Sequence, residues 1–153
     1  MTPRHAPPFR FTDRILECAA DRCVVLTLVS ASGVAREPGA AGTEDLPLTL
    51  VIEAMAQAAL PLLADREAAG GANRSAGDLP QAATVEAPGL LVGFDGVRLS
   101  GRVRPGDRLR ITSEIVARLG RLIRIRGQVD IDEVRVAEAE FTVVSGSPVD
   151  GVP

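Results

Sequence analysis

The feature that most constrains the fold is an apolar stretch over residues 46–64, in which Glu53 is the only ionisable side chain. Pro47 and Pro61 bracket the stretch, and proline suits the first turn of a helix but disrupts its interior. A helix between these prolines spans only about 21 Å, against roughly 30 Å for the hydrocarbon core of a membrane. We therefore expect a buried helix that does not cross a membrane.

Glu53 is the candidate catalytic residue of this helix. Burial of a carboxylate without partners costs several kcal/mol, so a buried carboxyl group becomes able to exchange protons near neutral pH. The alternative is that Glu53 lies near the helix N-terminus, where the helix dipole favours a negative charge, and points to water. Gln57 favours a site, because it lies at i+4 and places the two polar groups of the helix interior on one face.

The composition narrows the classes of function. A chain of 153 residues suits a single domain. The formal net charge is -3 and aromatic residues make up 3%, so a base-stacking surface for nucleic acid is not expected. Residues 1–10 lack the apolar segment of a secretory signal, which predicts a cytoplasmic location.

No metal or cofactor site is expected. Cys18 and Cys23 are the only cysteines and His5 is the only histidine, so no zinc spacing can be written. In a reducing compartment we interpret both cysteines as small apolar fillers, with a cross-strand pair as the alternative. The chain has no glycine-rich phosphate loop at a strand-to-helix junction.

The pattern of apolar residues predicts an α+β domain. Short β-rich runs at 14–17 and 22–30 precede the helix, and further strands follow it over 89–144. In one of these strands we expect a buried face formed by Leu109, Ile111, Ile115, Ala117 and Leu119. The last strand changes phase near Val136, which predicts a bulge. Pro61 predicts a kink or an early end of the helix, with a separate turn over 62–69.

A helix that is apolar on all sides must be wrapped by the sheet. We therefore expect one domain over 1–153 with its core at about 7–145, a surface insertion at about 69–88 and a disordered tail at 146–153. A single curved antiparallel sheet leaves an open edge, and pairing with a second copy would cover it.

Several segments, in order, resemble the β-hydroxyacyl acyl-carrier-protein dehydratases of fatty-acid synthesis, which have the hotdog fold. Residues 8–17, PFRFTDRILE, are similar to the family's opening P-F-L-L-V-D-R-V-L-E. Residues 50–59, LVIEAMAQAA, are similar to its helix L-I-I-E-A-M-A-Q-A-A. Residues 92–109 resemble A-G-I-D-N-A-R-F-K-R-P-V-x-P-G-D-Q-L, and residues 138–140 match the end of the closing C-E-A-E. The resemblance implies a hotdog fold, in which a curved antiparallel sheet wraps around a long central helix.

One departure from the family concerns the catalytic histidine. In the family this histidine lies fourteen residues before the glutamate, in a loop G-H-F-P-G-x-P-x-x-P-G, and works with the glutamate of the partner subunit. That position is Gly39 here, and the family's glycine after Pro47 is Leu48. His5 lines up with a different histidine of the family, and we interpret it as a surface residue.

The resemblance also implies roles for other residues. Glu53 would protonate the departing β-hydroxyl, while the backbone N–H at Leu48 would bind the thioester carbonyl. We expect substrate contacts from Gln57, Gly93 and Phe94. Candidates for docking an acidic carrier protein, with a solvated surface as the alternative, are Arg98, Arg102 and Arg104.

Three hypotheses follow. The chain is a dehydratase-like protein of fatty-acid-type biosynthesis, impaired or dependent on a histidine-bearing partner; or a hotdog thioesterase that uses Glu53; or a subunit that binds acyl thioesters without chemistry. The expected partners are a second copy of the chain, with a trimer of dimers or a heterodimer as alternatives, and an acyl carrier protein or coenzyme A thioester.

Overall fold

The computed structural model of the protein describes residues 11–30, 45–63 and 90–145. The insertion expected at about 69–88 and the tail expected at 146–153 lie outside the described residues, as do His5 and Gly39.

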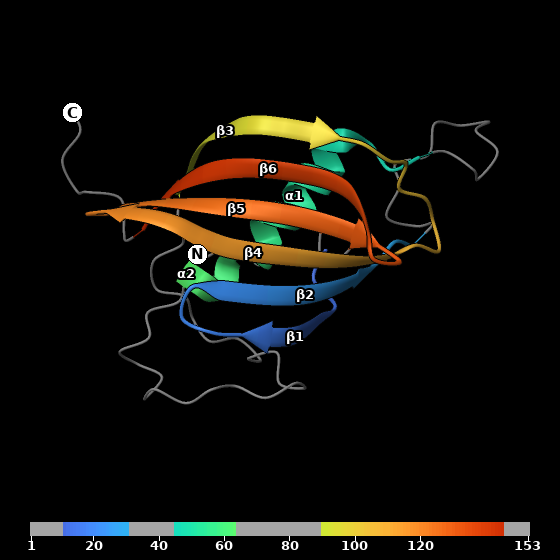
Figure 1. Cartoon of the computed structure of the whole chain (residues 1–153), viewed down its shortest axis with the longest axis horizontal. Helices are drawn as coiled ribbons and strands as arrows, with labels where there is room; N and C mark the ends of the chain where they lie inside the picture. Colours follow the sequence, from blue (N-terminus) through green and yellow to red (C-terminus); the bar gives the residue numbers. More distant parts are fainter. Residues whose placement is uncertain (1–10, 31–44, 64–89, 146–153) are drawn as a thin grey trace, which may run out of the picture.

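Six strands form one antiparallel sheet in the order β1-β2-β4-β5-β6-β3, and α1 lies against one face of this curved sheet (Figure 1). The elements are β1 (Arg14–Cys18), β2 (Arg22–Leu28), α1 (Leu48–Ala58), α2 (Leu60–Leu63), β3 (Leu90–Leu99), β4 (Arg108–Leu119), β5 (Leu122–Ile131) and β6 (Val134–Val144). Helix α1 contacts the four central strands, β2, β4, β5 and β6. The expected α+β architecture, a sheet around a helix, is confirmed.

The prolines set the limits of the helix. Pro47 is the N-cap residue of α1, and its carbonyl accepts the N–H of Leu50 at 2.9 Å. The helix ends at Ala58, and a separate short helix, α2, already begins at Leu60, one residue before Pro61. The early end is therefore confirmed, although the following turn begins earlier than expected. Within the described ranges, no helix has the length and apolarity needed to cross a membrane.

The core lies between α1 and the inner face of the sheet. Val51, Ala54, Met55 and Ala58 on the helix are fully buried. Alternate residues of the strands face them, and the largest fully buried side chains of the sheet include Phe141, Leu109, Ile111, Ile125 and Val129. Burial of this apolar surface is the main stabilising contribution to the fold.

Two of the register shifts in the sheet decide which side chains of β4 and β6 reach the core. Val129 pairs with Ala137 and Asp130 pairs with Arg135, so Val136 is an extra residue and the predicted bulge is confirmed. A second bulge on β4 was not predicted, because Ile115 pairs with Ile125 but Ala117 pairs with Arg124. The expectation of one buried face along all of β4 was wrong after Ile115. Ala117 is exposed and Leu119 is 77% exposed, because the extra residue shifts the alternation.

The two cysteines lie opposite each other on β1 and β2 and are not joined by a disulfide. Cys23 is fully buried in the core and Cys18 packs against the same cluster, in agreement with their interpretation as fillers. A hydrogen bond with Cys18, together with burial, raises the pKa of the Cys23 thiol well above its usual range.

Gly127 lies on β5 where Met55 of α1 and Phe141 of β6 pack against the sheet. A Cβ atom at this position would lie 3.1 Å from the Sδ atom of Met55 and 3.1 Å from the Cε1 atom of Phe141. Both neighbours are fully buried and come from different elements, so neither has free space to move into. We expect Gly127→Ala to lower the free energy of unfolding by about 1–3 kcal/mol, measured by urea denaturation. Gly93→Ala is the matched control, because a Cβ atom there meets nothing within 4 Å.

The two edges of the sheet differ. Strand β1 is short, whereas β3 is ten residues long and exposes Leu90, Val92 and Leu99 to fractions of 70%, 59% and 46%. A long apolar edge is a template for pairing with another chain.

Candidate functional site

Glu53 lies in the middle of α1 and is half-buried in the single chain. The Nε2 atom of Gln57 donates a hydrogen bond to its Oε1 atom at 2.8 Å. The two polar side chains therefore share one face of the helix, as their i+4 spacing predicted. Gln57 itself is only 4% exposed, so this bond is shielded from water on the glutamine side.

The other end of the Gln57 amide binds the main chain of the segment before β1. The N–H of Phe11 donates to the Oε1 atom of Gln57 at 2.9 Å. The carbonyl oxygen of Phe11 in turn accepts a hydrogen bond from the Oγ1 atom of Thr27 on β2. Sequence analysis missed Phe11 and Thr27, because no local pattern signals a main-chain contact across 46 residues.

The N-terminus of α1 offers backbone donors. Pro47 provides no side-chain cap, so the N–H groups of Leu48 and Thr49 have no acceptor within the helix. Leu46, the residue before Pro47, is hydrogen-bonded to the loop after β3. Its N–H donates to the carbonyl oxygen of Val103 at 2.6 Å. Leu48 is 37% exposed at this end. These donors and the helix dipole suit a carbonyl oxygen that gains negative charge.

Two of the three predicted docking arginines gather at this helix end. The Nε atoms of Arg102 and Arg104 lie 2.7 Å and 3.2 Å from the two carboxylate oxygens of Asp45. Two guanidinium groups thus share one carboxylate, and the Oδ2 atom of Asp107 accepts the main-chain N–H of Arg104 at 2.7 Å.

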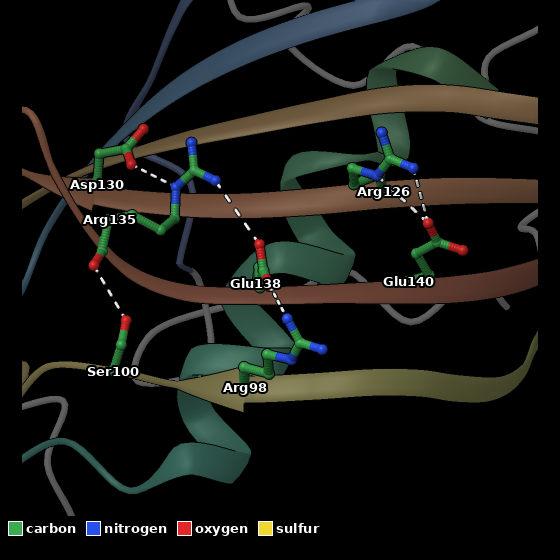
Figure 2. A network of polar contacts seen from close by, with 7 residues as sticks. All are labelled: Arg98, Ser100, Arg126, Asp130, Arg135, Glu138 and Glu140. Carbon is green, nitrogen blue, oxygen red and sulfur yellow. Dashed lines mark hydrogen bonds and ion pairs between the residues drawn. The ribbon is translucent and has the colours of Figure 1, made fainter.

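The third predicted arginine, Arg98, lies apart from this pair, on the outer face of β3. It binds Glu138 on β6 at 3.2 Å, and Glu138 also lies 3.9 Å from Arg135 (Figure 2). Arg135 lies 2.5 Å from Asp130, so Arg98 belongs to a chain of alternating charges. This arrangement fits the alternative interpretation of a solvated face.

A second group on the same outer face surrounds Glu140. Arg124 and Arg126 contact its carboxylate at 2.9 Å and 3.0 Å. The hydrogen bond from Arg126 lowers the pKa of Glu140 below its usual value (Figure 2). The outer face of β5 and β6 therefore carries basic groups that are already paired with acids.

The predicted substrate residues Gly93 and Phe94 lie on edge strand β3. Phe94 packs against Phe141 with ring centroids 5.7 Å apart, while Gly93 is exposed and pairs with Thr142. Phe94 thus contributes to the core cluster from the edge that a partner chain could cover. In the part of the chain that the structure describes, no group of three or more acidic, histidine or cysteine side chains could hold a metal ion.

Solved structures with the same architecture include the dehydratase heterocomplex ApeI:P from Xenorhabdus doucetiae. The similarity has a TM-score of 0.68 at 16% identity and covers 95% of this chain and 89% of that chain. Zebra fish thioesterase superfamily member 2 has a TM-score of 0.59 at 15% identity, with 86% and 80% covered. The chain is therefore placed in the class of hotdog-fold proteins.

Relatives in sequence show which family within this class the chain belongs to. No family model matches the chain. The 3-hydroxyacyl-acyl-carrier-protein dehydratase FabZ of Anaeromyxobacter dehalogenans is 34% identical over 142 residues, which cover 90% of this chain and 81% of the relative. The FabZ of Syntrophobacter fumaroxidans is 29% identical over 147 residues, with 94% and 88% covered. The chain belongs to the FabZ family of 3-hydroxyacyl-acyl-carrier-protein dehydratases.

Proposed function

We propose that this chain is a dehydratase-type subunit that supplies Glu53 as the acid for dehydration of 3-hydroxyacyl thioesters, and that a partner chain supplies the histidine. The observation that carries this proposal is an acid held in place by Gln57 in a chain whose only histidine is His5. A relative in fold that is itself a dehydratase heterocomplex supports assembly from two different chains.

The reaction requires a base and an acid, and two different chains can supply these groups. A base removes the proton α to the thioester carbonyl, and an acid protonates the β-hydroxyl as it leaves. Backbone N–H groups at a helix N-terminus stabilise the enolate oxygen that forms between these events. This protein offers the acid at Glu53 and backbone donors at Leu48 and Thr49, but no imidazole at Gly39. A positioned acid or base contributes about 10²–10⁴-fold, so a homodimer of this chain should dehydrate slowly.

The β3 edge is the surface through which we propose the partner pairs. Its exposed apolar residues, and an edge that pairs with no other strand within the described residues, suit a second β3 strand, which would extend the sheet across two subunits. Carrier-protein docking is proposed at Arg102 and Arg104, since their side chains are 72% and 55% exposed at the helix end. An acidic carrier or the phosphates of coenzyme A would suit these guanidinium groups.

A complementation experiment tests this proposal. A histidine-bearing FabZ homologue whose own catalytic glutamate is replaced by glutamine is co-expressed with this chain, and hydration of a 2-butenoyl thioester is followed by loss of enoyl absorbance. Each homodimer lacks one group, so we expect activity only in the heterodimer, where the homologue's histidine faces Glu53. A purified heterodimer with no activity above either homodimer would contradict the proposal.

A thioesterase that uses Glu53 is the second candidate, because a single carboxylate can activate water without histidine. The same preparations separate the two reactions when release of free thiol from saturated acyl-CoA is measured beside hydration. Thiol release by the isolated chain that Glu53→Gln abolishes would favour the thioesterase. Thioester binding that Glu53→Gln leaves unchanged, without either reaction, would favour a binding subunit.

A further inference from the structure

We infer that Gln57 determines which oxygen of Glu53 carries the transferable proton: the Oε1 atom accepts the amide N–H, and the proton is held on Oε2. Gln57 is then a positioning residue for the acid and not a substrate-binding residue. The role of Gln57 in catalysis rests on the proposed function, because it requires Glu53 to be the acid.

The main-chain N–H of Phe11 fixes the direction of both hydrogen bonds of Gln57. A main-chain N–H can only donate, so the side-chain atom of Gln57 that faces Phe11 at 2.9 Å must be the oxygen. The amide nitrogen must then face Glu53, at 2.8 Å from its Oε1 atom. An amide nitrogen is only a donor, so Oε1 has to be an acceptor in both protonation states of Glu53.

Burial holds this arrangement in place. Gln57, Thr27 and Phe11 are 4%, 3% and 8% exposed, and the hydroxyl of Thr27 fixes the peptide of Phe11 from the β2 side. A rotated amide would place its two donors against the N–H of Phe11, and a buried donor without an acceptor costs about 1–3 kcal/mol. The glutamine therefore has one favoured orientation, and Glu53 has one favoured site for its proton.

This asymmetry has a chemical consequence. When Glu53 acts, its Oε2–H bond breaks and the proton goes to the β-oxygen of the substrate. The Cβ–O bond then breaks to release water, while the electron pair left at Cα by the base forms the double bond. The carboxylate left behind keeps the N–H of Gln57 on Oε1 as a charge-assisted hydrogen bond, which stabilises the product state of the acid.

Neutron diffraction tests the proton position without any turnover. Deuterated crystals are equilibrated at a pH below the ordinary range of a glutamate, and nuclear density is examined at both oxygens of Glu53. We expect a deuteron on Oε2 and a deuterated amide of Gln57 directed at Oε1. A deuteron on Oε1, or a Gln57 oxygen directed at Glu53, would overturn the inference.

A kinetic experiment tests the positioning role in the complemented heterodimer. Gln57→Met keeps the length of the side chain but removes its donor. We expect kcat to fall by about 10- to 100-fold while KM changes by less than about twofold, because the acid loses its orientation but the substrate loses no contact. Thr27→Val removes the hydrogen bond to the carbonyl oxygen of Phe11 and should also lower kcat, by a smaller factor than Gln57→Met. This second variant tests the positioning role if the Gln57→Met protein does not fold.

Ser113→Ala is the matched control. Ser113 is fully buried on β4, and within the described residues its hydroxyl has no hydrogen-bond partner, so the change removes a buried polar group that does not bind Gln57. It should leave kcat and KM unchanged. A rise in KM alone for Gln57→Met would overturn the inference in favour of substrate binding. If Glu53→Gln has no effect on the reaction, the proposed function fails, whereas the neutron result still decides the role of Gln57.

Discussion

Replacement of Glu53 by glutamine should lower kcat of the complemented heterodimer by about 10²–10⁴-fold. Glutamine has nearly the same shape, and its carbonyl oxygen can still accept the N–H of Gln57, so the contact seen at 2.8 Å is kept. The variant lacks only the acidic proton that the departing hydroxyl requires. Steady-state hydration of a 2-butenoyl thioester measures the effect, and thermal unfolding shows whether the fold is kept.

Glu114→Gln is the control for this substitution. Glu114 is exposed on β4 and faces away from α1, so the same chemical change there should leave kcat within about twofold of the unchanged protein. Equal activity of the Glu53→Gln and Glu114→Gln proteins would show that Glu53 is not the acid. Loss of thioester affinity at an unchanged kcat would instead make Glu53 a binding residue.

Introduction of lysine at both Leu90 and Val92 should convert the assembled protein into monomers. These side chains are 70% and 59% exposed in the single chain, and pairing of two β3 edges would remove them from water. A cost of about 3 kcal/mol for burying the added charges would raise the dissociation constant about 100-fold. Sedimentation velocity over a range of concentrations measures the change, and loss of complemented activity should accompany it.

Leu119→Lys controls for the effect of added charge on an exposed apolar residue. Leu119 is 77% exposed but lies at the end of β4, away from the β3 edge. We expect the Leu119→Lys protein to have the same mass in solution as the unsubstituted protein. A dimer that survives lysine at Leu90 and Val92 would show that the subunits pair through another surface.

The elements that local patterns determine were predicted from the sequence. The apolar stretch between two prolines gave a helix in the expected place, and i+4 spacing placed Glu53 and Gln57 on one face. The phase change near Val136 predicted its bulge, because the alternation of β6 itself records the extra residue. These features depend on neighbours within one or two turns of the chain, so a sequence contains the information for them.

Features that depend on distant residues could not be predicted in the same way. The bulge on β4 was missed because Val116 and Ala117 are both small and apolar, so the pattern does not show which of them is extra. The contact of Arg102 and Arg104 with Asp45 joins two segments that only the fold brings together. The docking prediction treated three arginines as one surface, whereas the structure places Arg98 in a separate network with Glu138.

The contact between Phe11 and Gln57 uses a peptide group and not a side chain. Any amino acid with an amide hydrogen can donate this bond, and only proline removes the donor. The Phe11 side chain is also part of the buried core, so the position combines a packing role with a main-chain role. Phe11→Ala is expected to lower stability while it keeps the donor, whereas trimming that removes residue 11 is expected to release Gln57 as well.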